Sequence, residues 1–582
     1  MNQLYYGDNL LVLRDQLADE SVDLIYLDPP FNSKRDYNLL FKSPKIVAGE
    51  SGYSAAQIEA FLDTWHWTQD VAEKEYDEIV KGSDTTVSRM MIALVDFLGR
   101  NDMTAYLVMM ARRLLELHRV LKPTGSLYLH CDPTASHYLR IVLDAVFGAE
   151  NFRSEIIWRR SGAHNSAKRY GPIHDTIFFY SKTESFCWNR VFSPYAFDYI
   201  KTFFNKQDSK GRFRTQTLTG AGTRNGESGK AWRGYDPTAK GRHWAFPGSL
   251  ADELAISDLS LHEKLDYIAD HDLLVSGDWL PEYRQYLNES PGVPIQDIWA
   301  YQPFTNGVLH GTSDPIDNDV RWISDRNDPE RLGYPTQKPL GLLQRIIRAS
   351  SNEGDVVLDP FCGCGTAVHA AQKLRRKWIG IDITCLAIAL IESRLKKAFP
   401  ESLDTRDARR LQYEVIGTPK DLESARDLAR RDKYQFQWWA VSLIDEAQPW
   451  QGKKKGADTG IDGIRYFRDL DRKEIHTILI SVKGGENVGP AMVKDLIATL
   501  ARDKADIGLF LTLAPPTKAM LTEAAAAGFY ESPNGRKYAR LQLLTIEGLL
   551  DKTQRAEHPD YEPDTGYKKA RAEAHGEQPK LL

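Results

Sequence analysis

Two Asp-Pro turns, far apart along the chain, constrain the fold more than any other feature. Residues 28–31 read Asp-Pro-Pro-Phe and follow the apolar run 22–27, while residues 359–366 read Asp-Pro-Phe-Cys-Gly-Cys-Gly-Thr and follow the apolar run 356–358. A doubly wound α/β sheet forms a nucleotide pocket from strands that end in an acidic residue and a glycine-rich turn. The sequence therefore predicts an α/β fold in which two such strand ends lie beside each other.

The length of the chain predicts more than one domain, because 582 residues exceed what a single hydrophobic core usually supports. Helical apolar spacing runs over 103–120, 340–350 and 421–443, and strand-like runs alternate with the first two. The expected division is an α/β domain in two pieces (1–150 and 331–400), an insertion (151–330), a linker (401–420), a second, smaller α/β domain (421–550) and a flexible tail (551–582).

Composition disfavours several classes of protein. The first residues do not combine a basic region with an apolar stretch, and no apolar run approaches the ~20 residues that cross a bilayer, so we expect no signal peptide and no membrane partner. Five cysteines are too few for a disulfide framework, which favours a reducing, cytoplasmic location. Cys362 and Cys364 lack the second ligand pair of a zinc site, so we interpret them as small residues of a tight loop.

The net charge of −5 conceals a basic segment beside an acidic one. Residues 151–250 hold 17 Lys and Arg against 7 Asp and Glu, whereas residues 251–330 hold 4 against 17. Cations neutralise phosphates and flat rings stack on bases, so a basic segment with many aromatic residues suits nucleic acid. A solvated face around an ordinary core explains the same composition, and the sequence leaves both open. The aromatic residues of the basic segment include Trp158, Tyr170, Phe203, Phe204, Phe213, Trp232 and Trp244.

Four short elements, taken in their order, carry a resemblance to a known family. Gly-Asp-Asn at 7–9 and the Asp-Pro-Pro-Phe turn at 28–31 come first, and Thr-Gln-Lys-Pro at 336–339 precedes the glycine-rich loop at 359–366. This order resembles the β-class amino-methyltransferases of DNA. The resemblance implies a Rossmann-like S-adenosylmethionine-dependent methyltransferase domain with an inserted target-recognition region, and DNA as its partner.

For the first turn, the resemblance implies a catalytic role that the residue types support. Asp28 can accept a hydrogen bond from an exocyclic amine, Pro29 and Pro30 stiffen the loop, and Phe31 offers a face for an extruded base. Taken alone, the tetrad is equally compatible with a plain Pro-Pro turn. In this family a leading Asp goes with N6 of adenine, although the chemistry of the motif leaves N4 of cytosine open.

The second turn lacks the GxGxxG pattern of a nicotinamide-binding loop. Glycines without a Cβ permit close approach of a cofactor, and Asp382, which ends the next strand-like run, can accept both ribose hydroxyls. The cofactor that the resemblance implies is S-adenosylmethionine. The residues it assigns to cofactor binding are Asp8, Asn9, Thr336, Lys338, Asp359, Phe361, Gly363, Gly365, Thr366 and Asp382.

The basic segment lies where the β class carries its target-recognition region. A basic aromatic surface carries no readable base code, so the recognition sequence stays open. Phosphate contacts are predicted for Arg159, Arg160, Lys168 and Arg169, and contacts to base edges for His164 and Asn165.

Near the C-terminus, Gly-Ile-Asp-Gly at 460–463 and Ile-Leu-Ile-Ser-Val-Lys at 478–483 resemble the core of Mrr-like restriction endonucleases of the PD-(D/E)xK group. The resemblance implies a nuclease site in which Asp462 binds Mg²⁺ and Lys483 orients the attacking water. Ser481 stands where such enzymes have an acidic residue or Gln, and it is a poor Mg²⁺ ligand. Candidate replacements are Glu423 and Glu446, and Mg²⁺ is expected only if this site cleaves DNA.

Three functions stay open at this point. The leading one is a site-specific DNA adenine-N6 methyltransferase of a restriction-modification or defence system. The alternatives are a bifunctional enzyme that also cleaves DNA, and a non-catalytic DNA-binding or defence subunit that uses S-adenosylmethionine as a conformational ligand. A homodimer and associated restriction or defence subunits are compatible with each.

Overall fold

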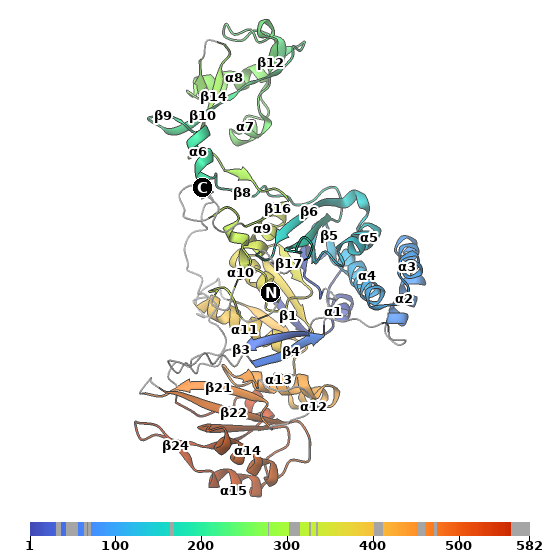
Figure 1. The fold of residues 1–582 in the computed structure, drawn as a ribbon, viewed down its shortest axis with the longest axis vertical. Coiled ribbons are helices and arrows are strands. Elements are labelled where there is room, and N and C mark those ends of the chain that lie inside the picture. Colours follow the sequence, from blue (N-terminus) through green and yellow to red (C-terminus); the bar gives the residue numbers. More distant parts are fainter. Residues whose placement is uncertain are drawn as a thin grey trace. The chain divides into compact units, whose positions relative to one another are not determined.

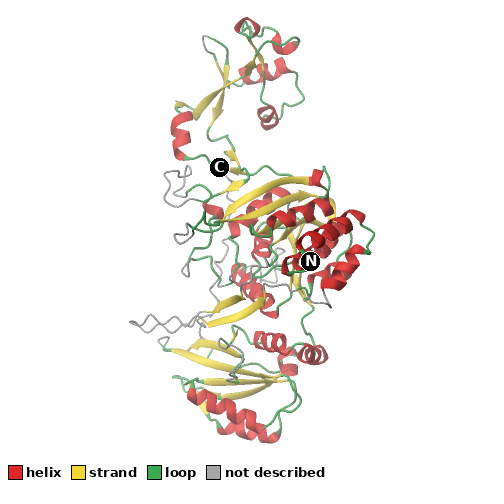
Figure 2. Cartoon of the chain, turned by 45° about the vertical axis from the view of Figure 1, so that its right-hand side comes forward, coloured by secondary structure: helices red, strands yellow, loops and turns green. Residues whose placement is uncertain are grey.

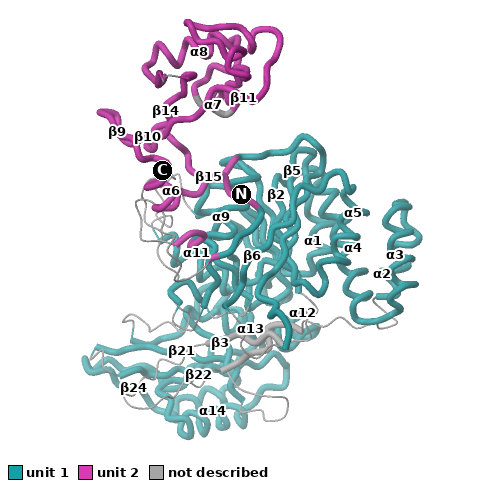
Figure 3. Tube along the Cα trace, turned by 45° about the horizontal axis from the view of Figure 1, so that its top comes forward, with its two compact units in different colours: residues 1–189, 297–300, 319–574 teal, residues 190–296, 301–318, 575–582 magenta. Residues whose placement is uncertain are grey.

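The computed structural model describes residues 1–30, 36–41, 56–62, 67, 72–162, 168–276, 279–301, 315–324, 328–332, 334, 336–400, 411–450, 460–470 and 474–559. The chain forms two compact units, coloured teal and magenta in Figure 3. The first contains Met1–Asn189, Asp297–Ala300 and Asp319–Ala574, and the second is built mainly from Arg190–Gln296. No helix of the described residues is long and apolar enough to cross a bilayer.

A nine-stranded sheet forms the centre of the first unit, in the order β16-β6-β7-β5-β2-β17-β18-β1-β19. All neighbouring strands run parallel except β7, which is antiparallel to both β5 and β6. The predicted α/β fold is confirmed. The strands are β1 (Asn2–Tyr6), β2 (Val22–Leu27), β5 (Leu121–Cys131), β6 (Phe152–Arg159), β7 (His174–Ser181), β16 (Ile298–Trp299), β17 (Val356–Asp359), β18 (Lys377–Asp382) and β19 (Tyr413–Ile416), and a separate hairpin consists of β3 (Asp36–Phe41) and β4 (Ala56–Leu62).

The two Asp-Pro turns meet at one edge of this sheet because β2 and β17 are parallel neighbours. Leu358 is in register with Ile25, so the turns that follow the two strands begin side by side. The next two strands in the sheet, β18 and β1, are also parallel, with Tyr6 in register with Asp382. Four consecutive strands therefore place their carboxyl ends along one edge, which is where open α/β sheets bind their ligands.

Helices cover both faces of the sheet (Figure 1). On β5, Leu127 and Leu129 point into the core that the sheet shares with α1, α3, α4 and α5, whereas the Tyr128 hydroxyl lies 2.7 Å from the Ser350 hydroxyl of α9. Alternate residues of a strand face opposite sides, so α9 lies on the other face. These helices are α1 (Asn9–Gln16), α2 (Ala72–Val80), α3 (Thr85–Leu98), α4 (Asp102–Val120), α5 (Ser136–Phe147), α9 (Leu340–Ser350), α10 (Thr366–Lys373) and α11 (Cys385–Ala398).

The main sheet extends beyond the sequence boundary at residue 150. β6 and β7 pair with each other and with β5 inside the nine-stranded sheet, and the second unit begins at Arg190. This boundary is set by hydrogen bonding between strands, and the composition of the sequence does not reveal it. The basic loop over 159–169 therefore connects two strands of the main sheet and is separate from the second unit.

The second unit has a small antiparallel sheet in the order β13-β14-β10-β9. Its acidic helix α8 begins with a capping box, in which the Ser260 hydroxyl and the Glu263 carboxylate each accept a backbone N–H. Its elements are β8 (Phe192–Ser193), α6 (Phe197–Phe203), β9 (Lys206–Asp208), β10 (Gly211–Thr217), β11 (Thr219–Ala221), β12 (Arg242–Trp244), α7 (Gly248–Glu253), α8 (Leu261–Asp270), β13 (Leu274–Val275), β14 (Glu282–Tyr286) and β15 (Val293–Pro294).

Most of the aromatic residues in the basic segment belong to hydrophobic cores. Tyr170 and Phe203 are exposed. The other five rings are buried, so they have no free face on which a base could stack. Among the seven aromatic residues named from the sequence, stacking on nucleic acid is restricted to the two exposed ones. The buried five are Trp158, Phe204, Phe213, Trp232 and Trp244.

The C-terminal part of the first unit folds around a five-stranded sheet in the order β20-β21-β22-β23-β26 (Figure 2). Helices α12 and α13 pack with Ile480 on one face of this sheet, and α14 and α15 pack with Leu479 on the other. Its elements are α12 (Leu422–Arg431), α13 (Lys433–Ser442), β20 (Gln448–Pro449), β21 (Gly463–Arg468), β22 (Ile475–Lys483), α14 (Pro490–Arg502), β23 (Ile507–Thr512), α15 (Lys518–Ala526), β24 (Phe529–Glu531), β25 (Lys537–Ala539), β26 (Leu541–Thr545) and α16 (Ile546–Leu550).

The single helix predicted over 421–443 is wrong, because Asp432 divides it into two. The Asp432 backbone is extended, and its carboxylate accepts the N–H groups of Tyr434 and Gln435, each at 3.0 Å, so it caps α13. Leu428 and Phe436 are spaced as on one continuous helix, which is why spacing alone misses the break. Most of the predicted linker and tail (401–410 and 560–582) lies outside the described residues.

Candidate functional site

A cavity of about 290 Å³ lies at the carboxyl ends of β1, β2, β17 and β18. The turns after all four strands line it, so it brings together residues from both ends of the methyltransferase-like part of the chain. The predicted catalytic and cofactor-binding residues among its lining are Asp8, Asn9, Asp28, Pro29, Pro30, Thr336, Lys338, Asp359, Phe361, Gly363, Thr366 and Asp382.

An ion pair ties the first Asp-Pro turn to the Thr-Gln-Lys-Pro segment, 310 residues away in sequence. Lys338 Nζ lies 2.5 Å from Asp28 Oδ2 and also donates to the Thr336 carbonyl at 3.3 Å. The side chains of Lys338 and Asp28 are only 9% and 14% exposed. Because little water screens the pair, the attraction is stronger than at the surface. Lys338 therefore holds the Asp28 carboxylate at the cavity wall.

The glycine-rich loop after β17 adopts a backbone conformation that needs its glycines. Gly363 has a φ of +49° and Gly365 a φ of +73°, in the left-handed region that favours glycine. A Cβ on Gly363 would lie 3.2 Å from the Tyr334 ring, and one on Gly365 would lie 2.8 Å from Ile391. Gly363 lines the cavity, whereas Gly365 precedes α10 and contributes through its backbone shape.

Asp359 ends β17 as a buried carboxyl group. Its Oδ1 accepts the Phe361 N–H at 3.1 Å. Burial raises the pKa of Asp359 well above its ordinary value, and the carboxylates of Asp28 and Asp382 raise it further. A positively charged group bound in the cavity would oppose this shift and favour the ionised form.

Asp382 ends β18 and shapes the rim of the cavity. Its Oδ2 accepts the Gly363 N–H at 2.9 Å, and its Oδ1 accepts both the N–H and the hydroxyl of Thr384 at 2.9 Å. Burial raises the pKa of Asp382 to about 6, although these hydrogen bonds act to lower it. The carboxyl group therefore titrates close to physiological pH.

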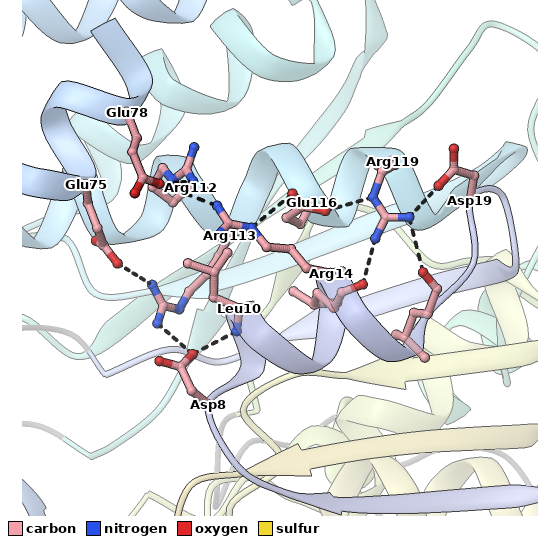
Figure 4. Close-up of polar contacts among 12 residues, drawn as sticks. Asp8, Leu10, Arg14, Asp19, Glu75, Glu78, Arg112, Arg113, Glu116 and Arg119 are labelled. Carbon is pink, nitrogen blue, oxygen red and sulfur yellow. Dashed lines mark hydrogen bonds and ion pairs between the residues drawn. The ribbon is translucent and has the colours of Figure 1, made fainter. Parts of the chain in front are cut away.

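The turn after β1 is held by Arg113 of α4, which Figure 4 shows between Asp8 and Glu75. Arg113 pairs with Asp8 at 3.1 Å and lies 3.8 Å from Glu75. Its Nε donates to Asn9 Oδ1 at 2.6 Å, and Asn9 Nδ2 donates to the Pro360 carbonyl at 2.8 Å. These contacts join the first strand turn directly to the glycine-rich loop.

Arg394 of α11 supports the glycine-rich loop from within the core. It donates to the Cys364 carbonyl and the Thr366 hydroxyl, both at 3.0 Å, and its Nε lies 3.0 Å from His369 Nδ1. The thiols of Cys362 and Cys364 are buried, which raises their pKa. Among the described residues, no group of three or more His, Cys, Asp or Glu is placed to hold a metal ion.

The predicted DNA-contacting residues differ in their surroundings. Arg159 lies over the ring of a tryptophan, 5.2 Å from its centre, and Arg160 pairs with buried Asp175 at 3.1 Å. Lys168 and Arg169 are exposed. The remaining predicted site residues, Phe31, His164 and Asn165, lie outside the described residues.

Sequence reasoning missed several residues that line the cavity, among them Tyr26, Tyr334 and Arg113. Tyr26 reads as one more apolar residue of the strand before Asp28. Tyr334 stands two residues before Thr336, and no spacing rule marks it, although its ring lies against Gly363. Arg113 had a weak signal, since it is a charge within an otherwise apolar stretch of α4.

In the C-terminal domain, Asp462 and Lys483 lie beside the same end of β22. Asp462 Oδ2 accepts a backbone N–H of β22 at 2.6 Å, one residue before Lys483. Ser481 is buried in that strand. Of the candidate replacement acids, Glu446 pairs with a lysine of α11 at 3.2 Å, and Glu423 is exposed in the first turn of α12.

Comparison with known families agrees with this geometry. A family model described as DNA methylase, for N6 and N4 methylation, matches residues 22–392, which include both Asp-Pro turns. The chain belongs to this DNA methylase family. A second family model, of the Mrr type and described as restriction endonuclease, matches residues 428–548. The resemblances drawn from the sequence in both parts of the chain are confirmed.

Several known proteins are similar to this member of the family. The type II methyltransferase M.EcaI of Enterobacter cloacae is 32% identical over 292 residues, which cover 50% of this chain and 57% of that protein. The StyLTI Mod subunit, a type III restriction-modification enzyme of Salmonella typhimurium, is 24% identical over 65% of this chain and 50% of its own. The chain thus spans about half the length of these curated relatives. The crystal structure of the M1.HpyAVI–SAM complex is 15% identical, covers 68% of this chain and 99% of its own, and gives a TM-score of 0.29.

The cavity residues fit S-adenosylmethionine in their charge. Four carboxyl groups, those of Asp8, Asp28, Asp359 and Asp382, line the cavity. S-adenosylmethionine carries an ammonium group and a sulfonium centre, and both offset this concentration of acids. Gly363 has no Cβ, so a cofactor can approach its backbone closely, as expected of a loop that contacts the cofactor directly.

The pKa of Asp382 predicts that cofactor binding depends on pH. We predict that ribose hydroxyls donate to the ionised Asp382 carboxylate, and such binding would favour the deprotonated form and lower this pKa from about 6. The affinity for S-adenosylhomocysteine is therefore expected to fall as pH decreases below 6, by up to about tenfold per pH unit. Isothermal titration calorimetry between pH 5 and pH 8 measures this.

Asp382→Asn serves as the control, because an amide has no charge to lose. It is expected to bind S-adenosylhomocysteine more weakly at pH 8 and to show a shallower pH dependence than the wild type. An unchanged slope in the variant would show that Asp382 is not the group responsible.

Proposed function

We propose that this protein transfers a methyl group from S-adenosylmethionine to N6 of adenine at specific sites in DNA. The observation that carries the proposal is the parallel pairing of β2 with β17, which places the Asp28 turn and the Asp359–Thr366 loop in one cavity. Membership of the DNA methylase family over residues 22–392 supports methyl transfer to an exocyclic amine.

The chemistry is mainly a problem of alignment, because a thioether leaves readily from a sulfonium. When bound, S-adenosylmethionine supplies an electrophilic methyl group. Asp28 accepts a hydrogen bond from the exocyclic amine and so directs the nitrogen lone pair. Pro29 and Pro30, which have fixed φ angles, keep the turn stiff.

Around the turn, other residues hold the cofactor. In this proposal Asp359 binds the cofactor ammonium and Asp382 the ribose hydroxyls, and their position in the cavity lining supports both roles. Lys338 lies next to Asp28 and binds the carboxylate end of the cofactor. The same lysine therefore contacts both the catalytic turn and the cofactor.

Adenine is favoured over cytosine because the turn opens with Asp28 and not with Ser. DNA is the partner that the family implies, and the cytoplasm is the compartment expected from the sequence. Type III Mod subunits among the relatives suggest that a restriction subunit also joins this chain.

Substitution of Asp28 tests the proposed reaction. Asp28→Ala removes the acceptor that aligns the amine, so methyl transfer to unmethylated DNA is expected to fall by about 100-fold or more. Binding of S-adenosylhomocysteine is expected to remain, because Asp359 and Asp382 are intact. Transfer of tritium from labelled S-adenosylmethionine measures the rate, and mass spectrometry of the digested product identifies the base.

Asp15→Ala is the matched control, since Asp15 is an exposed residue of α1 away from the cavity lining. N6-methyladenine is the expected product. If the product is N4-methylcytosine, methyl transfer is retained as the reaction but adenine is wrong as the target base. Full activity in Asp28→Ala would contradict the mechanism.

DNA cleavage by the C-terminal domain is a second candidate function. The match of residues 428–548 to a restriction endonuclease model favours it, and so does the position of Asp462 beside the strand that ends in Lys483. The buried Ser481 weighs against it, because a hydroxyl replaces the second Mg²⁺ ligand. We therefore propose that this domain contacts DNA without cutting it.

Incubation of unmethylated DNA with Mg²⁺ distinguishes the two roles. The wild type and Lys483→Ala are both expected to leave DNA intact, and Lys483→Ala is expected to bind DNA more weakly. Cleavage by the wild type that is absent in Lys483→Ala would establish a bifunctional enzyme.

A further inference from the structure

A line of polar residues runs from the cavity wall across the sheet to the basic loop. The Tyr26 hydroxyl of β2 lies 3.0 Å from His130 Nδ1 of β5, and His130 Nε2 lies 3.1 Å from Asp175 Oδ2 of β7. Asp175 Oδ1 lies 3.1 Å from Arg160 Nη1, directly after β6. The four strands are consecutive in the sheet. We call the residues Tyr26, His130, Asp175 and Arg160 the Tyr26–Arg160 network.

The inner part of this network is fully buried, with exposed fractions of 2% for Tyr26, 0% for His130 and 2% for Asp175. Burial alone would raise the pKa of Asp175, but the hydrogen bond with His130 and the charges of Lys338 and Arg160 hold it below its ordinary value. The Asp175 carboxylate can accept a hydrogen bond from His130 Nε2, and His130 Nδ1 lies at hydrogen-bond distance from the Tyr26 hydroxyl. Burial also raises the pKa of Tyr26, so this hydroxyl keeps its proton.

Arg160 is directed toward the protein interior. Its side chain is 32% exposed, and it reaches Asp175 Oδ1 at an ion-pair distance. Among the described residues that oxygen has no hydrogen-bond partner, so its contact with Arg160 is an attraction between charges without hydrogen-bond geometry. In the same loop, Lys168 and Arg169 are exposed and form no ion pair with any described residue. The loop therefore contains two kinds of basic residue.

The network ends two residues before the catalytic turn. Tyr26 lies in β2 two residues before Asp28, and both residues line the cavity. Methyl transfer depends on alignment, and a displacement of about 1 Å in the reacting groups can cost about 100-fold in rate. A fixed Tyr26 ring therefore matters for the rate more than for binding.

We propose that the Tyr26–Arg160 network positions the catalytic turn, and that Arg160 acts in it as the counter-charge of Asp175 and not as a phosphate contact. This inference rests on the proposed methyl transfer. It assigns to Tyr26, His130 and Asp175 the role of positioning residues, because each acts through its neighbour in the network.

The test compares two ends of the network in the full-length protein. Tyr26→Phe and Arg160→Met are each expected to lower kcat for methyl transfer by about tenfold. The dissociation constants for S-adenosylhomocysteine and for DNA are expected to change by less than about twofold, because Tyr26→Phe keeps the ring that lines the cavity and Arg160 is directed toward Asp175. Tyr26→Phe removes one hydroxyl and keeps the buried ring, so it is the variant least expected to perturb folding.

Lys168→Met is the matched control from the same loop. It removes an exposed charge, so it is expected to weaken DNA binding and to reduce the salt dependence of log K by about one phosphate contact. Arg160→Lys is expected to keep most of the wild-type kcat, because the contact with Asp175 requires a positive charge but no hydrogen bond.

The double variant Tyr26→Phe/Arg160→Met decides whether the residues act as one unit. A single network predicts a loss close to that of either single variant, about tenfold, whereas independent effects multiply to about 100-fold. A multiplied loss overturns the inference, as does an Arg160→Met variant that behaves like Lys168→Met. Absence of methyl transfer in the wild type is a separate outcome, which overturns the proposed function and this inference with it.

Discussion

The parallel pairing of β2 with β17 is the constraint on which the whole site depends. It brings together two turns that the chain separates by more than half its length, and it leaves both turns open to the same edge of the sheet. β18 and β1 continue this edge, so the carboxyl ends of four neighbouring strands share one cavity. No single segment of the chain contains this site.

The charges around the cavity favour a positively charged ligand. Asp28, Asp359 and Asp382 crowd around it, and two of them have raised pKa values because burial disfavours their charged forms. A ligand with positive charge relieves this cost, whereas S-adenosylhomocysteine, which has lost the sulfonium charge, relieves less of it. The same electrostatics that bind the methyl donor therefore favour release of the product. Lys338 keeps Asp28 in place while this exchange occurs.

Much of the site could be predicted because its residues are local in sequence. Asp28, Asp359 and Asp382 each follow a run of strand residues, and Gly363 sits in a recognisable turn. The contacts that hold them are not local. Asn9 reaches Pro360 and Arg113 reaches Asp8 across long stretches of chain, and nothing in their spacing records this.

Prediction of the fold was limited in the same way, by contacts that are not local in sequence. Helical apolar spacing located α4 and α9, but the break at Asp432 depends on a side chain that caps the following helix. The boundary at 150 failed to anticipate that β6 and β7 extend the main sheet, because strand pairing is decided by partners far away. Composition left open whether Trp158, Trp232 and Trp244 stack on nucleic acid or fill a core, and the structure buries all three.

A crystal structure with S-adenosylhomocysteine and target DNA tests the central claim most directly. The account predicts an extruded adenine whose N6 donates to Asp28, with the thioether sulfur facing that nitrogen and room for one methyl group between them. A cofactor and a base that enter from opposite sides of the sheet, or a base held away from the Asp28 turn, would contradict it.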